Sequence, residues 1–245
     1  MFEERKKWIR TRFGNIDETI LGQIDKVEGL SWPDIIKEYD VRGNKFKYQM
    51  VRNIEGSAER IAEIYINGLD EMVGNINYEW LFNPEEIINN VRKGDWNFYG
   101  CYFEGKLIAV VSMEIIQGQR AMHWFWGCVD PIFRCMGVWH HFGEYLDEVT
   151  EKSGAQLGFL GAVTSHKYSQ MMVEKAGYKP IGLFVGHDFL GGSNGRYYRQ
   201  NLVYYSKLYG ESVLHLQKWE SMELTESARK LAKTINELWA DVRKE

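Results

Sequence analysis

Cysteine, proline and long apolar runs are all scarce in this sequence. It contains three cysteines (Cys101, Cys128 and Cys135) and four prolines among 245 residues. So few cysteines, without metal-ligand spacing, exclude a disulfide scaffold and fit a reducing cytosol. The longest apolar run, residues 107–116, is far shorter than the roughly 20 residues that cross a bilayer. No apolar segment follows the charged start of the chain, so we expect no secretory signal and a soluble, cytoplasmic protein.

The sequence also lacks a strong excess of either positive or negative charge. The formal net charge is −4, with acidic and basic residues interspersed. There is no broad basic face for nucleic acid and no polybasic patch for a membrane surface, so neither is expected as a partner. The hydrophobic fraction of 44% is ordinary and supports a full core without structural metal. Nine Trp and fourteen Tyr residues either pack in that core or line a pocket.

Residues 121–149 organise the chain. An aromatic-rich strand over 121–129 ends at Asp130, a short loop carries Arg134 and Gly137, and an amphipathic helix follows over 137–153. A loop between a strand and a helix start leaves backbone N–H groups without internal partners, and the helix dipole favours a negative charge there. The pattern therefore indicates either a phosphate site or an ordinary strand–helix turn.

The rest of the chain predicts an α+β fold with a mixed, mostly antiparallel sheet flanked by helices. Residues 1–46 read as short helices, one of them carrying Ile35, Ile36 and Tyr39, and 211–245 as a helical tail behind a Thr225 cap. The tail either docks on the core or pairs with a second copy of the chain in a homodimer. The expected strands are 48–54, 97–103, 107–116, 157–163, 178–189 and 200–208, and the expected helices are 57–69, 84–93 and 167–176.

Two motifs within this element order resemble the GNAT acyltransferase superfamily, which moves acyl groups from acyl-coenzyme A to amines. The first, residues 129–139, is VDPIFRCMGVW, similar to the family's diphosphate loop. The second is a strand and a helix ending in Gly177-Tyr178. The resemblance covers about 48–210 and implies a GNAT-like domain over 47–210, between helical extensions at 1–46 and 211–245.

The resemblance also implies which residues bind acetyl-coenzyme A. The backbone around Cys128 and Val129 would align the pantetheine arm, and His166 and Ser169 would face the coenzyme. Three positions depart from the family pattern: Trp139 replaces a small loop residue, His166 replaces an asparagine, and Val173 replaces a tyrosine that often serves as acid. The diphosphate would be held by the backbone amides of Arg134, Cys135, Met136, Gly137, Val138 and Trp139.

Direct transfer to an amine requires a base, and its thiol product requires a proton. His123, in the strand before the loop, is the first candidate base because an imidazole titrates near neutrality; its alternative is a packed sheet residue. Glu114, in the preceding strand, is the second candidate, or a solvent-facing residue. Tyr168 is the nearest phenol for the acid, and water is its alternative.

Arginines near the last strand suggest how an acceptor binds. Arg196, Tyr198 and Arg199 suit an amine that carries a carboxylate, although simple surface charge explains them too. Cys135 beside Arg134 is a weak candidate for an acyl-cysteine, since no base has the required spacing. No metal site is expected.

The sequence therefore favours an N-acyltransferase that moves an acetyl or short acyl group from acyl-coenzyme A to a primary amine of a small molecule in a ternary complex. Transfer to a protein or peptide amine is one alternative. A non-catalytic coenzyme A-binding sensor or interaction module is the other, kept open by Trp139 and Val173.

Overall fold

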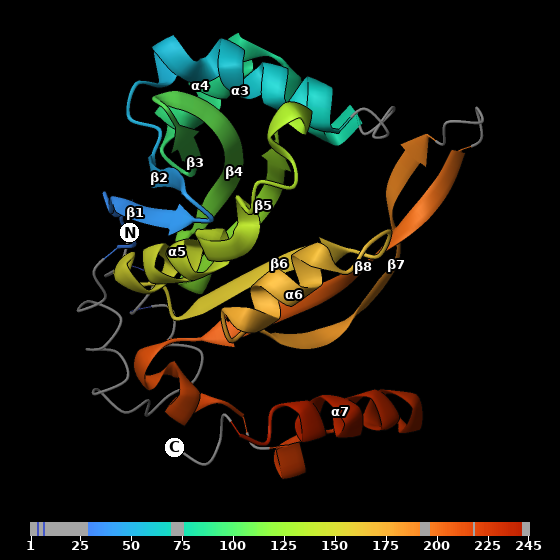
Figure 1. The fold of residues 1–245 in the computed structure, drawn as a ribbon. Helices are drawn as coiled ribbons and strands as arrows, with labels where there is room; N and C mark the ends of the chain where they lie inside the picture. The colour runs from blue at the N-terminus through green and yellow to red at the C-terminus, as the bar shows by residue number, and fades with distance from the viewer. Residues whose placement is uncertain are drawn as a thin grey trace.

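A single mixed sheet of eight strands runs through the protein in the order β1-β2-β3-β4-β5-β6-β8-β7 (Figure 1). The computed structural model describes residues 29–69, 76–191, 197–217 and 219–241, together with positions 4 and 7. The strands are β1 (Lys37–Val41), β2 (Asn44–Met50), β3 (Trp96–Phe103), β4 (Lys106–Ile116), β5 (Ala121–Val129), β6 (Leu157–Val163), β7 (Lys179–Gly191) and β8 (Tyr197–Leu208). The helices are α3 (Ile54–Gly68), α4 (Pro84–Lys93), α5 (Trp139–Lys152), α6 (Tyr168–Lys175) and α7 (Glu226–Leu238). Short 3-10 segments are η1 (Ile76–Phe82), η2 (Gln117–Gln119), η3 (Pro131–Phe133), η4 (Gly210–His215) and η5 (Trp219–Ser221).

The expected α+β fold class is confirmed. Neighbouring strands pair antiparallel at every step of the sheet except between β5 and β6, which run parallel. That parallel contact covers only the positions from Ala121 opposite Leu157 to Trp124 opposite Leu160. Beyond it the two strands diverge, and β6, β8 and β7 splay away from the first five strands (Figure 1).

The β1–β2 hairpin corrects the sequence analysis. The expected helix around Ile35, Ile36 and Tyr39 is wrong, because residues 37–41 pair with residues 44–48 at one edge of the main sheet. Arg42 and Gly43 both take left-handed conformations (φ of 57° and 84°), as a tight hairpin turn requires, and Asp40 Oδ1 accepts the Gly43 amide at 2.8 Å. The rest of the extension expected at 1–46 lies mostly outside the described residues.

Helix ends follow the capping signals in the sequence. Asn83 accepts the amides of Glu85 and Glu86 and is followed by Pro84 at the first turn, while Gly94 ends α4 in a left-handed conformation. α3 begins at Ile54, earlier than expected, because Asn53 rather than Ser57 caps it and accepts the Gly56 amide at 3.1 Å. β3 and β4, expected as strands 97–103 and 107–116, pair as an antiparallel hairpin.

The sheet separates two apolar clusters, which define its faces. On the α5 face, Trp124, Phe142 and Leu146 belong to one buried cluster. On the α3 face, Ile61 and Tyr65 belong to the other, which also includes residues of β3, β4 and β5. Since side chains alternate along a strand, the face of each strand residue follows from its neighbours in these clusters.

The C-terminal helix docks on the core. α7 lies along β7 (Figure 1), where Trp239 is buried with its Nε1 3.4 Å from Pro180 O, and Lys179 pairs with Asp241 at 2.6 Å. Thr225 caps α7 as expected, but η4 and η5 precede it in place of continuous helix. Among the described residues, no helix has both the length and the apolar character that a membrane span requires.

Candidate functional site

A run of backbone amides without acceptors lies between β5 and α5. After η3, Cys135 and Gly137 adopt left-handed conformations, with φ of 68° and 87°. No acceptor within the described chain is bound by the amides from Cys135 to Trp139, and the first turn of α5 has no side-chain cap. Free amides in such a turn, at the positive end of a helix of 14 residues, favour a bound anion, so these amides are the candidate anion site.

The start of this loop is held by Asp130. Its Oδ1 accepts the amide of Ile132 at 3.1 Å, and its Oδ2 accepts from Arg60 of α3, whose Nε also donates to Leu107 O at 3.0 Å. Burial acts to raise the pKa of Asp130, but the hydrogen bonds from Arg60 and Ile132 outweigh it and hold the pKa below its ordinary value. The carboxylate therefore ties the loop to α3 and β4.

The end of the loop is held by the β1–β2 hairpin. The Tyr48 hydroxyl, which is buried, donates to Val138 O at 2.8 Å. A Cβ built on Gly137 would lie 2.8 Å from Cγ1 of Val41, so only glycine fits at this position. The hairpin expected to be part of a helical cover thus forms one wall of the anion site.

Trp139 packs beneath α5. Its ring is stacked on Phe142 with centroids 5.1 Å apart, and its Cη2 lies 2.8 Å from where a Cβ on Gly127 would be. At this departure from the family pattern, the Trp139 side chain therefore has a packing role.

A bulge interrupts β5 beside this loop. Val111 opposes Gly127 and Met113 opposes Trp124, so β5 carries one extra residue. Ser112 Oγ accepts the amide of Trp126 at 3.2 Å within the bulge. Gly127 is exposed although β5 lies in the middle of the sheet. The divergence of β6 therefore leaves backbone of β5 accessible next to the anion site.

Cys128 and Val129, which the resemblance assigns to the pantetheine arm, follow Gly127 and are buried. Cys128 Sγ lies 3.4 Å from Ile64 O of α3. Arg134 is exposed, and its Nη2 donates to Gly68 O at the end of α3, at 3.0 Å. Cys135 is exposed as well, and its backbone takes a left-handed conformation.

The start of α6 carries a second unsatisfied polar group. Ser169 Oγ is buried, yet it has no hydrogen-bond partner among the described residues. His166 is exposed, and its ring lies 5.6 Å from that of Tyr168, whose side chain is 70% exposed. Val173, one turn after Ser169, is fully buried in the core cluster. Ser169 thus has an unmet hydrogen bond, whereas Val173 has only packing contacts.

The two candidate bases lie together where β5 and β6 begin to diverge. His123 and Glu114 are directly opposite each other on neighbouring strands, and His123 Nδ1 is 3.4 Å from Glu114 Oε2. The imidazole stacks on Phe159 of β6, with centroids 4.5 Å apart and planes within 8°. It also meets the edge of Phe125, so its orientation is fixed by three contacts on the α3 face.

Facing them is a polar group that sequence reasoning missed. Tyr78 of η1 contacts Phe125 and Trp126, with centroids 4.8 and 5.6 Å away. Burial raises the pKa of Tyr78, and the charges of Asp188, Tyr204 and Glu114 raise it further, which places all of them within electrostatic reach of one phenol. The only signal for Asp188 in the sequence is a charged residue inside an otherwise apolar strand.

The predicted acceptor arginines are not brought to this place. Arg199 Nη1 donates to Gly186 O at 3.1 Å and its guanidinium lies 5.9 Å from the Phe189 ring centre. It alternates with Gln200, Leu202 and Tyr204 and so faces the other side of β8. Tyr198 shares the Tyr204 face but sits toward the far end of the hairpin, exposed. Arg196 lies outside the described residues.

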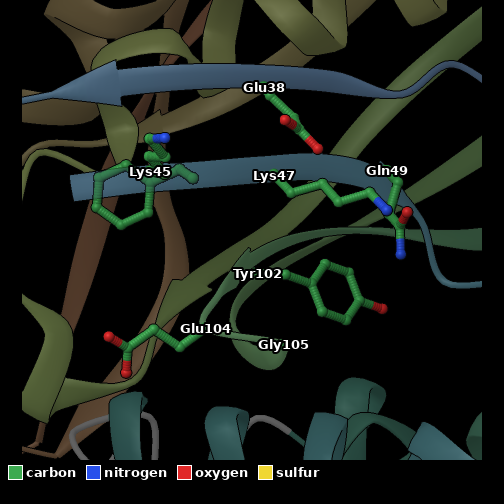
Figure 2. Close-up of a pocket in the computed structure, with 8 residues that line it drawn as sticks. Glu38, Lys45, Lys47, Gln49, Tyr102, Glu104 and Gly105 are labelled. Carbon is green, nitrogen blue, oxygen red and sulfur yellow. The ribbon is translucent and has the colours of Figure 1, made fainter.

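A separate hollow lies at the other edge of the sheet. Figure 2 shows this pocket of about 370 Å³, where Glu38 of β1 and Lys47 of β2 approach Tyr102 of β3. None of its lining residues belongs to the anion site or to the His123 pair. Its mixed charges give no reason to place a reaction there.

Comparison with known proteins supports the fold. No protein-family model matches the sequence, and no curated protein sequence matches it. A mutant spermidine N-acetyltransferase from Vibrio cholerae superposes with a TM-score of 0.54 at 16% identity, over 68% of this chain and 95% of that one. A ribosomal-protein-S5-alanine acetyltransferase from Vibrio fischeri gives 0.52 at 13%, over 71% and 97%. A ribosomal L7/L12 α-N-protein acetyltransferase solved with coenzyme A gives 0.53 at 11%, over 71% and 98%.

Proposed function

We propose that this chain, which has the fold of the GNAT N-acetyltransferases, transfers an acetyl or short acyl group from acyl-coenzyme A to a primary amine. The acceptor is a small molecule, and transfer is direct, within a ternary complex. The observation that carries the proposal is the run of unpaired amides from Cys135 to Trp139 beside the exposed backbone of Gly127.

These groups fit coenzyme A. The amides and the helix dipole suit its diphosphate, and Arg134 at the mouth adds a permanent positive charge. The backbone of β5 that is exposed at Gly127, next to Cys128 and Val129, suits the amide groups of pantetheine, which would pair like an added strand. Ser169 Oγ, buried and without a partner, supplies a further hydrogen bond from α6.

His123 is the proposed base. When bound, acyl-coenzyme A supplies an acyl carbon whose bond to sulfur breaks as the bond to the amine nitrogen forms, releasing a thiol. His123 accepts the proton that the attacking nitrogen loses, directly or through water. Glu114, 3.4 Å from Nδ1, orients the ring. In this proposal the exposed backbone of β5 at Gly127 polarises the thioester carbonyl as negative charge develops on its oxygen.

The proton for the departing sulfur has a different source from the usual one. Val173 occupies the position of the family's tyrosine and is fully buried, so it contributes packing alone. Tyr168, at the exposed start of the same helix, remains the proposed donor, with water as the alternative.

Thiol release from acetyl-coenzyme A across a panel of primary amines, with the product identified by mass spectrometry, tests the proposal. We expect release that depends on the amine and a product heavier by one acetyl group. Arg134→Glu should weaken coenzyme A binding by about tenfold through charge reversal beside the diphosphate. Lys233→Glu, the same reversal on exposed α7, should leave binding unchanged.

Two other results would redirect the proposal. Release only with peptides that have a free amino terminus would assign a protein acceptor, like those named for two of the similar structures. Coenzyme A binding without release by any amine would instead support the sensor alternative. Absence of coenzyme A binding would overturn the proposal altogether.

A further inference from the structure

Asp188 is buried, and only one of its two carboxylate oxygens has a hydrogen-bond partner among the described residues. Its side chain is 1% exposed, and Oδ1 lies 2.7 Å from His187 Nδ1. Oδ2 has no partner within the described chain. A buried carboxylate oxygen without a hydrogen bond is destabilising, so its presence calls for a partner, and a bound ligand is one that can supply it.

A break in β7 places this side chain. Phe184 opposes Leu202 and Asp188 opposes Gln200, so β7 spends two more residues than β8 between these pairs. Gly186 takes a left-handed conformation there (φ of 69°), and its amide donates to Asn201 Oδ1 at 2.8 Å. The local backbone is thus shaped around the position of Asp188 and is held by a specific side chain.

Only one oxygen of Asp188 has a hydrogen-bonding contact within the part of the protein that the structure describes. His187 Nδ1 lies 2.7 Å from Asp188 Oδ1, and His187 Nε2 faces the Tyr204 hydroxyl 3.5 Å away. Neither Asp188 nor Glu114 forms an ion pair with a lysine or arginine in the described part of the chain. Oδ2 of Asp188 is therefore left for a cation that a ligand supplies.

The carboxylate faces the same space as the proposed reaction centre. Phe159 of β6 stacks on His123, which lies on the α3 face. Gly161 is two residues further along β6, so it lies on the same face. A Cβ on Gly161 would lie 3.3 Å from Tyr204 Cε2, which puts the Tyr204 ring on that face too. Tyr78 bridges the two sides, since the charges of both Asp188 and Glu114 act on its hydroxyl.

We propose that the acceptor is an amine with a second positive charge, and that Asp188 Oδ2 binds this second cation between the rings of Tyr78 and Tyr204. This inference rests on the proposed acyl transfer and names its substrate class. The first amino group loses its proton to His123, while the second stays protonated and is held by a charge-assisted hydrogen bond and by aromatic faces. The expectation of a carboxylate-bearing acceptor is replaced by one of opposite charge.

Three acceptors of equal chain length test the inference: a linear diamine, the alkylamine that ends in a methyl group, and the amino acid that ends in a carboxylate. We expect the wild type to prefer the diamine by at least about tenfold in kcat/KM. Asp188→Asn should raise KM for the diamine about 30-fold and leave kcat and the alkylamine's KM within about threefold. Glu151→Gln, which removes an exposed carboxylate on α5, should change neither.

Binding separates this inference from the proposed function. Calorimetric titration of the diamine into the coenzyme A complex needs no turnover, and we expect heat with the wild type and none with Asp188→Asn. If no amine is acylated but this difference holds, the reaction fails and the cation site stands. If amines are acylated while Asp188→Asn keeps the wild-type preference, the cation site is wrong and the reaction stands.

A second variant guards against misfolding of Asp188→Asn. Tyr78→Leu removes one aromatic wall and leaves the carboxylate in place. It should weaken diamine binding several-fold more than alkylamine binding, because only the diamine has a cation to lose its aromatic contact. Equal effects on the two amines would contradict the proposed site.

Discussion

At the scale of single residues, the His123–Glu114 pair is the sharpest test of the chemistry. His123→Ala removes the group that accepts the amine proton, so kcat should fall by about 100-fold while the affinity for coenzyme A is unchanged. Steady-state kinetics and coenzyme titration measure the two quantities separately. An unchanged kcat would remove His123 from the mechanism.

His141→Ala is the matched control for that variant. It also removes a partly exposed imidazole beside a glutamate, 22% exposed against 15% for His123, but from the α5 face, where His141 stacks on Tyr39. We expect kcat within about twofold of wild type, because proton transfer does not involve this ring.

At the scale of elements, the 131–138 loop depends on the two features that hold its ends. Gly137→Ala places a methyl group against Val41 and forces a non-glycine residue into a left-handed conformation, which by itself costs about 1 kcal/mol. The loop must shift, so coenzyme A affinity should fall more than about tenfold, as measured by calorimetry.

Gly43→Ala separates strain from position. Gly43 has nearly the same φ as Gly137 (84° against 87°), but a Cβ there meets nothing within 4 Å. Thermal unfolding should show a similar backbone cost, whereas coenzyme A affinity should be retained. Equal loss of affinity in both variants would mean that strain, and not the shape of the loop, lowers binding.

At the other end of the loop, Asp130 predicts that the free energy of unfolding falls in acid. Because the pKa of Asp130 is lower in the folded protein, its stabilising contribution is fully present above the unfolded value of about 3.9 and is lost as pH falls through the folded value. Asp130→Asn leaves Arg60 without its buried partner, which costs about 3 kcal/mol. Denaturant unfolding at neutral pH and near pH 3 should show the difference between wild type and variant shrinking in acid.

At the scale of the whole molecule, buried phenols set the alkaline limit of stability. Burial is the largest cause that raises the pKa of six core tyrosines: Tyr48, Tyr65, Tyr99, Tyr145, Tyr178 and Tyr209. Unfolded tyrosine ionises near pH 10, so above that pH the unfolded chain binds fewer protons than the folded one. Stability is then lost as pH rises, by about 1.4 kcal/mol per pH unit for each such tyrosine.

This alkaline effect is measurable by ultraviolet absorbance. Tyrosinate from the six phenols should appear only together with loss of near-ultraviolet circular dichroism, in one cooperative step above pH 10. Smooth ionisation at pH 10 with the fold intact would show that these hydroxyls are accessible to water.

The sequence by itself determined the order of the elements from β2 to β8 and the position of the loop between β5 and α5. These follow from local physics: the apolar period of α5, the Asn83-Pro84 start of α4, the turn at Gly105 and a glycine where φ must be positive at 137. It also named His123 and Glu114 as two separate candidate bases, and the structure places them opposite each other on β5 and β4.

Only the tertiary structure decided which distant segments meet. Residues 37–41 were mistaken for helix because their strand identity comes from pairing with β2. The contact between Val41 and the position of Gly137 could not be anticipated for the same reason. Asp188, Tyr204 and Tyr78 come from separate segments of the chain, and the divergence of β6 from β5 brings them to one space. The oxygen of Asp188 that lacks a hydrogen bond exists only in this packed arrangement. A buried polar atom without a hydrogen bond is a consequence of packing, so no pattern of residues along the chain can reveal it.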